Sequence, residues 1–175
     1  MKRVLVSAAS KHGATAEMAG WIGEALADNG VEAVVRPPRE VSSLDGFDAV
    51  VLGSGVYMGK WLDDANALVD RFAEELRARP VWLFSSGPAG DPARPEADPV
   101  DAGQIVTATG ARDHRIFPGR LERRHLGFAE WAIVSALRVP DGDYRPRIEV
   151  DVWAGEIARA LESAPSSPPV SPVSA

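Results

Sequence analysis

Two hydroxyl side chains, Ser10 and Thr15, flank a single glycine in a short loop near the start of the chain. The predicted binding residues of this loop are Ser10, Lys11, His12, Gly13, Ala14 and Thr15. An apolar run precedes the loop and a helical pattern follows it, so backbone N–H groups and the positive end of a helix converge there. The loop therefore predicts a site for a phosphorylated ligand, with glycine allowing close backbone approach. The alternative is an ordinary strand-to-helix turn capped by Ser or Thr.

The spacing of this loop excludes two widespread phosphate-binding motifs. Only one glycine lies between Ser7 and Thr15, so the pattern G-x-x-x-x-G-K-S/T is absent. The dinucleotide-binding pattern G-x-G-x-x-G is absent from the loop for the same reason. A phosphate here would be bound by hydroxyl and backbone donors.

Two later loops carry residues that suit a planar ring beside that phosphate. Segment 53–61 combines glycines with Tyr57 and Trp61, and segment 85–91 is rich in Ser and Gly. An aromatic side chain on a flexible loop can stack on a planar ligand and shield it from water. The alternatives are that the aromatic residues pack on the next helix, which we expect for Trp61 but not for Tyr57, and that 85–91 is a plain turn. The predicted contacts are Ser54, Gly55, Val56, Tyr57, Met58, Gly59, Ser85, Ser86, Gly87 and Pro88.

The composition indicates one ordinary globular domain. The chain has 175 residues, of which 45% are hydrophobic and 25% charged, enough for a sizeable core. The net charge of −6 argues against a nucleic-acid partner. The absence of cysteine excludes disulfides, thiol catalysis and cysteine-ligated metals. No stretch approaches the roughly 18 apolar residues of a membrane span, and no signal-peptide pattern is present.

Short apolar runs alternate with helical periodicity along the chain. The predicted strands are 4–6, 31–35, 48–52, 80–84 and 113–117, and the predicted helices are 14–27, 63–77, 102–109, 126–139 and 151–161. Apolar runs of this kind are typical of parallel strands covered by helices. We therefore predict an α/β fold, a doubly wound five-stranded parallel sheet with strand order 2-1-3-4-5 and helices on both faces. The three loops would meet at the carboxyl ends of the strands.

The loop 10–15 resembles the S-K-x-G-x-T loop of one flavodoxin-domain family, which includes bacterial menaquinone-dependent protoporphyrinogen oxidases. Segments that resemble corresponding parts of that family are 48–61, 84–88, 114–119 and 142–145. The resemblance covers roughly residues 1–162 and implies a flavodoxin-like domain, followed by a disordered Ser/Pro-rich tail at 163–175. It also implies bound FMN, with its phosphate in the first loop and its isoalloxazine between the other two.

The second half of the chain carries extra sequence whose role the sequence leaves open. A basic cluster at 120–125 adjoins an apolar, Trp-containing stretch at 126–134. This pairing suits a peripheral membrane contact through 120–134, and arginines there would equally suit the carboxylates of a tetrapyrrole substrate. The third interpretation is a helix that packs on the sheet. Residues 146–148 depart from the family, which often has an acidic residue and then Trp at this place.

Two functions follow from the resemblance. The first is an FMN-dependent oxidoreductase that oxidises protoporphyrinogen IX with a quinone as electron acceptor; no general base is evident, so no catalytic residue is assigned. The second is a non-enzymatic electron-transfer flavodoxin that docks redox partners through its acidic surface. A flavodoxin-like binding protein without cofactor is a third hypothesis. We expect a cytoplasmic protein, or one peripheral at the inner face of the cell membrane.

Overall fold

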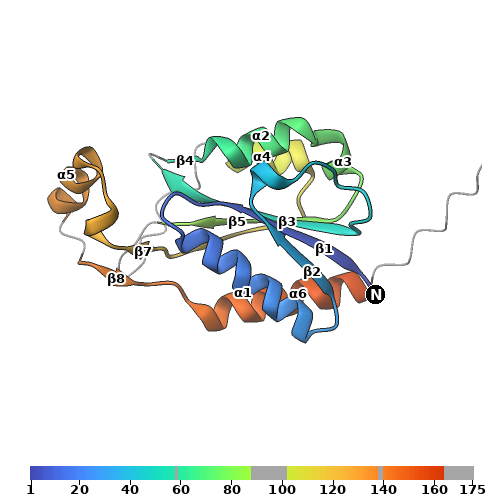
Figure 1. The fold of residues 1–175 in the computed structure, drawn as a ribbon. Helices are drawn as coiled ribbons and strands as arrows, with labels where there is room; N and C mark the ends of the chain where they lie inside the picture. The colour runs from blue at the N-terminus through green and yellow to red at the C-terminus, as the bar shows by residue number, and fades with distance from the viewer. Residues whose placement is uncertain (58, 88–101, 138–139, 164–175) are drawn as a thin grey trace, which may run out of the picture.

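The computed structural model describes residues 1–57, 59–87, 102–137 and 140–163. A parallel sheet runs in the order β2-β1-β3-β5-β6, which confirms the predicted topology (Figure 1). Its strands are β1 (Arg3–Ala9), β2 (Glu32–Arg36), β3 (Ala49–Tyr57), β5 (Val81–Ser86) and β6 (Asp113–Phe117). The short strand β4 (Lys60–Trp61) pairs antiparallel with the end of β3.

Helices cover both faces of this sheet. One face carries α1 (Ala14–Asp28) and α6 (Arg147–Glu162), and the other carries α2 (Asp63–Arg71), α3 (Ala73–Arg77) and α4 (Ala102–Thr109), as Figure 1 shows. A short 3-10 turn, η1 (Pro38–Glu40), follows β2. Alternate residues of each strand face opposite layers, so each helical layer has its own apolar core.

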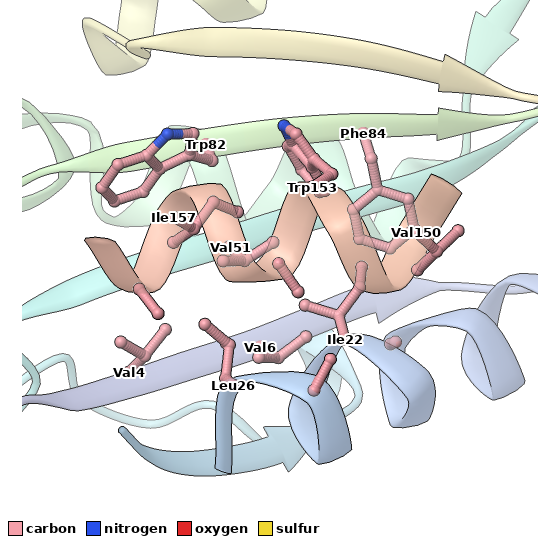
Figure 2. Packing of buried hydrophobic residues seen from close by; sticks show 14 of the residues in the cluster. Val4, Val6, Ile22, Leu26, Val51, Trp82, Phe84, Val150, Trp153 and Ile157 are labelled. Atoms are coloured by element: carbon pink, nitrogen blue, oxygen red, sulfur yellow. The ribbon is translucent and has the colours of Figure 1, made fainter. Parts of the chain in front are cut away.

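The core between the sheet and the pair α1 and α6 is built from branched aliphatic and aromatic side chains (Figure 2). Trp153 on α6 packs edge-to-face against Phe84 and Phe117, with ring centroids 6.2 and 5.7 Å apart. Its indole N–H donates to Asp113 at 2.9 Å, so the buried ring also has a polar partner. These contacts fix α6 across the centre of the sheet.

β3 extends five residues beyond its predicted end at residue 52, so the prediction of a loop beginning at Gly53 was wrong. Ser54 and Gly55 still pair with β5 in parallel register, opposite Ser85 and Ser86. A Cβ at Gly53 would lie 2.2 Å from the ring of Phe84. Glycine is there because an aromatic ring occupies the place of a side chain, rather than to make a turn.

The helices depart from the prediction in two places. The predicted helix 63–77 breaks at Phe72, whose φ of −119° is not helical, and so becomes α2 and α3. The last helix begins at Arg147, four residues before its predicted start, because Pro146 stands just ahead of it, a place where a missing N–H costs nothing. The tail that we predicted to be disordered lies, apart from Ser163, outside the described residues.

The segment between β6 and α6 forms a separate arm. It contains β7 (Arg120–Leu121), the 3-10 turn η2 (Arg123–His125), α5 (Phe128–Leu137) and β8 (Gly142–Asp143), with β7 and β8 paired antiparallel. Figure 1 shows α5 projecting beyond the carboxyl ends of the strands, away from both helical layers. The predicted helix 126–139 therefore exists in shortened form but does not pack on the sheet; residues 138–139 lie outside the described part of the chain.

Replacing Gly53 by alanine should lower the free energy of unfolding by about 1–3 kcal/mol, the usual cost of overpacking a core. Gly103→Ala is the matched control, because no described atom lies within 4 Å of a Cβ there. That control should change the free energy of unfolding by no more than about 0.5 kcal/mol, since Gly103 lies in the first turn of α4 and a Cβ there meets no described atom. Urea denaturation of both variants checks this, and an unchanged midpoint for Gly53→Ala would contradict it.

Candidate functional site

The loop between β1 and α1 has the backbone of an anion site. Gly13 precedes α1 with φ 86° and ψ −20°, a left-handed conformation that glycine adopts without strain. As a glycine, this N-cap residue offers no side chain to cap the first turn of α1. The N–H groups at the start of this helix receive no cap from that residue, so they can donate to an external acceptor, and the helix dipole favours an anion there.

Two hydroxyl groups of the loop are further donors for that external acceptor. The hydroxyl oxygen of Ser10 is buried and has no hydrogen-bond partner within the described part of the chain. Thr15 is only 4% exposed, and its hydroxyl oxygen would lie 3.2 Å from a Cβ on Gly55. Gly55 thus lets the end of β3 lie close against the loop. A buried hydroxyl without a partner is costly unless a ligand satisfies it.

Lys11 and Tyr57 bring the first and second predicted loops together. The Lys11 ammonium lies 3.9 Å from the centroid of the Tyr57 ring, a cation–π contact. Tyr57 is partly exposed at the end of β3, and Gly59 completes the following turn with φ 73°. The ring of Tyr57 therefore stands beside the phosphate loop; Met58 lies outside the described residues.

Trp61 is buried, as we expected, and ties β4 to β5. It is 3% exposed, and its indole N–H donates to the Ser85 hydroxyl at 2.8 Å. The same hydroxyl lies 2.8 Å from Nε2 of His114 on β6. In a similar way, the Ser54 hydroxyl accepts the backbone N–H of Leu62 at 2.9 Å. The hydroxyl groups of Ser54 and Ser85, both predicted site residues, therefore form hydrogen bonds that hold the loops in place.

The end of β5 meets β6 through a close backbone approach. Gly87 has φ 122°, and its N–H donates to the carbonyl of Phe117 at 2.9 Å. A Cβ on Gly119 would lie 3.4 Å from Cα of Gly87, and one on Gly87 would lie 3.9 Å from Cβ of Val56. Ser86 is also buried here. The second and third predicted loops therefore adjoin at one rim; Pro88 lies outside the described residues.

Arg145 connects the arm to the first loop. Its side chain is 3% exposed, donates to the carboxylates of Asp143 at 2.6 Å and Glu17 at 2.9 Å, and also donates to the carbonyl of Ala14 at 3.0 Å. The hydrogen bond from Arg145 is the main cause that lowers the pKa of Glu17 and of Asp143. The guanidinium also lies 4.5 Å from the ring centroid of Trp21. Ala14 begins α1, so Arg145 positions the helix end that forms the anion site.

Two further arginines extend this network along α1. Arg120 lies 3.1 Å from Glu17, and Arg147 lies 2.9 Å from Glu24. In the sequence, segment 142–145 stands out only through its resemblance to the family, and nothing there links these arginines to α1. Pairs this far apart in sequence leave no local spacing signal, so only the fold reveals them.

The sequence matches the flavodoxin domain family over residues 5–145. The chain belongs to this family. Solved structures agree on the fold: a flavodoxin from the domain Archaea is 18% identical, covering 93% of this chain and 99% of its own, with a TM-score of 0.63. A flavodoxin from Streptococcus pneumoniae TIGR4 is 17% identical, covering 92% of this chain and 98% of its own, with a TM-score of 0.60. No curated protein matches the sequence significantly.

A larger protein contains a similar domain. Rubredoxin oxygen:oxidoreductase from Desulfovibrio gigas is 16% identical over 93% of this chain and 37% of its own, with a TM-score of 0.63. Family membership implies FMN as the cofactor, and the first loop fits its phosphate, because an uncapped helix end and the unpartnered Ser10 hydroxyl meet there. The individual FMN contacts in the three loops stay predictions.

Thr15→Val should weaken FMN binding about tenfold, which corresponds to the ~1.5 kcal/mol of a hydrogen bond to a charged group. Thr107→Val is the control, since within the described part of the chain its hydroxyl donates to the Gly103 carbonyl of the same helix, α4. Quenching of FMN fluorescence on titration with apo-protein measures both affinities. Equal affinity for Thr15→Val and the wild type would remove Thr15 from the site.

Arg145→Met should destabilise the protein at neutral pH by about 1.5–3 kcal/mol, since it loses hydrogen bonds between charged groups. The lowered pKa values of Glu17 and Asp143 mean that this contribution is complete above about pH 5. This contribution is lost as the pH falls through the lowered pKa values of the two carboxyl groups. The free energies of unfolding of the variant and the wild type should therefore converge in acid. Urea unfolding across this pH range measures the difference.

Arg39→Met is the matched control for that series. Arg39 pairs with Asp64 at 2.7 Å, but its side chain is 79% exposed. An exposed pair of this kind contributes about 0–1 kcal/mol. A loss at Arg145 no larger than the loss at Arg39, or a loss that does not change with pH, would contradict the prediction.

Proposed function

We propose that this protein is an FMN-dependent oxidoreductase of flavodoxin type that passes electrons to a quinone at a membrane surface. Bound FMN supplies the hydride and single-electron chemistry, while the protein binds and orients it. The observation that supports a membrane acceptor is α5, an apolar helix held beyond the carboxyl ends of the strands (Figure 1). A carrier that only shuttles electrons between soluble partners has no need of such a helix.

The exposed side chains of α5 suit a lipid surface. Phe128 is 87% exposed and Trp131 is 49% exposed. The sequence of this helix contains one ionisable residue, Glu130. An apolar helix with aromatic side chains favours the interface between headgroups and acyl chains. No helix of the described chain is long and apolar enough to cross a bilayer, so the contact that we propose is peripheral.

A basic turn lies directly before α5. η2 contains Arg123, Arg124 and His125, and the side chain of Arg124 is 76% exposed. A basic residue near an anionic membrane contributes about 1 kcal/mol to the free energy of membrane binding. Glu122 offsets part of this positive charge by pairing with Arg124 and His125. The basic turn still favours an anionic lipid surface as the docking partner over a neutral one, although the whole chain carries a net charge of −6.

Protoporphyrinogen IX is the electron donor that we propose, and its support is the resemblance of the first loop and of segment 142–145. The basic cluster at 120–125 gives little support to protoporphyrinogen IX as the donor. Arg120 pairs with Glu17 at 3.1 Å, and Arg124 pairs with Glu122 at 2.8 Å, so both guanidinium groups already have carboxylate partners. Substrate carboxylates would have to compete with these ion pairs.

A non-enzymatic electron-transfer flavodoxin is the second candidate function. The similarity of the whole fold to flavodoxins supports it, and so does the acidic net charge, which suits basic redox partners. The two functions differ in whether the protein oxidises a substrate by itself.

The deciding experiment begins with the visible spectrum of the purified protein after FMN is added and excess is removed. Protein that retains the flavin band is then mixed with protoporphyrinogen IX and a soluble menaquinone analogue in the absence of air. Porphyrin fluorescence that rises only with protein, FMN and quinone together would support the enzyme. A retained flavin without porphyrin formation would favour the carrier, and a protein that cannot retain FMN would overturn both.

The double variant Phe128→Ser/Trp131→Ser should bind anionic vesicles with an affinity about tenfold lower or weaker still. The reason is that burying each aromatic side chain in the membrane stabilises the bound state by ~1.5–3 kcal/mol. Co-sedimentation with anionic vesicles at low salt measures this. The matched control is Ile148→Ser/Val152→Ser on α6, where the side chains are 79% and 55% exposed. Wild-type protein that stays in the supernatant, or equal losses for both variants, would refute membrane docking through α5.

A further inference from the structure

The arm brings a second histidine to the start of α1. The rings of His125 in η2 and His12 in the first loop are nearly parallel, with centroids 6.4 Å apart and planes inclined by 17°. Both side chains line one small pocket together with Ala14, the first residue of α1. A residue from the second half of the chain therefore shares a pocket with two residues of the first loop, His12 and Ala14.

We propose that His125 is a further cofactor-binding residue, which together with His12 holds the phosphate end of FMN. This inference rests on the proposed FMN cofactor and adds a fourth segment to its site. A phosphate monoester carries about −1.5 to −2 charges at neutral pH. Charged donors placed beside the uncapped end of α1 would complement that charge.

Glu122 holds the ring of His125 in a defined orientation. Nδ1 of His125 lies 3.1 Å from the Glu122 carboxylate. The hydrogen bond from Arg124 is the main cause that lowers the pKa of Glu122, so this carboxylate is ionised at neutral pH. An ionised carboxylate keeps a proton on Nδ1, and it directs Nε2 to the opposite side of the ring. An imidazole between Glu122 and a phosphate can hydrogen-bond to each of them through one of its two ring nitrogens.

The other charges of the pocket favour an anionic ligand. Arg120 lines the pocket and shares its guanidinium between Glu17 at 3.1 Å and Glu122 at 3.4 Å. The nitrogen donors that line the pocket are Arg120, His12 and His125, and the carboxylates next to them are Glu122 in the lining and Glu17 on the far side of Arg120. The pocket should therefore distinguish FMN from riboflavin, which has the same ring system but no phosphate.

The test measures dissociation constants of FMN and of riboflavin for the full-length apo-protein by fluorescence quenching. His125→Gln should weaken FMN binding about tenfold, because it removes a hydrogen bond to a charged group, and it should leave riboflavin binding unchanged. His125→Phe keeps a ring against His12 and should show the same selective loss. Arg39→Gln, which removes a positive charge elsewhere on the surface, should change neither affinity.

Each outcome decides the proposal. A selective loss of FMN affinity in both His125 variants supports it, and unchanged riboflavin binding shows in the same titration that the variants are folded. A wild-type FMN affinity in His125→Gln, or an equal loss for FMN and riboflavin, overturns the role of His125 while the FMN cofactor stands. Wild-type protein that binds neither flavin overturns this inference together with the proposed function.

Discussion

The buried guanidinium of Arg145 is the contact on which the rest of the site depends. It donates at once to Asp143 in its own arm, to Glu17 on α1 and to the carbonyl of Ala14. A guanidinium that is 3% exposed needs all of these acceptors, because an unpaired charge away from water is costly. The contact therefore fixes the arm relative to the first turn of α1. Both the pocket that contains His125 and the position of α5 follow from it.

The central strands create the rim that the arm completes. Gly53 and Gly55 let β3 run past the ends of its neighbours, since Phe84 and Thr15 occupy the space that side chains there would need. The hydroxyl groups of Ser54 and Ser85 then tie this extension to the segments on either side. Residues that first suggest ligand chemistry can thus serve to shape a site. Their backbone, and the unpartnered hydroxyl of Ser10, are what the rim offers to a cofactor.

Periodicity was sufficient to predict the strand order, because five apolar runs alternating with helices permit few right-handed topologies. It could not predict that the strand β3 continues through Gly53, since the reason lies in the ring of Phe84 on a neighbouring strand. The three loops could likewise be predicted from residue types. The arm could not, because its position depends on ion pairs such as Arg145 with Glu17, which no sequence spacing reveals. An apolar helical stretch has the same sequence pattern whether it packs on a sheet or projects from it.

Glu17 shows why the arm matters for an anionic cofactor. A carboxylate in the first turn of a helix stabilises that helix, but it would also repel a phosphate bound at the same end. Arg145 and Arg120 both donate to this carboxylate, at 2.9 and 3.1 Å, and offset its charge. Both arginines come from the arm, so docking of the arm turns an unfavourable first turn into one that tolerates an anion. The ion pairs that hold the arm against α1 are therefore the same ones that offset the charge of Glu17 at the end of α1 next to the first loop.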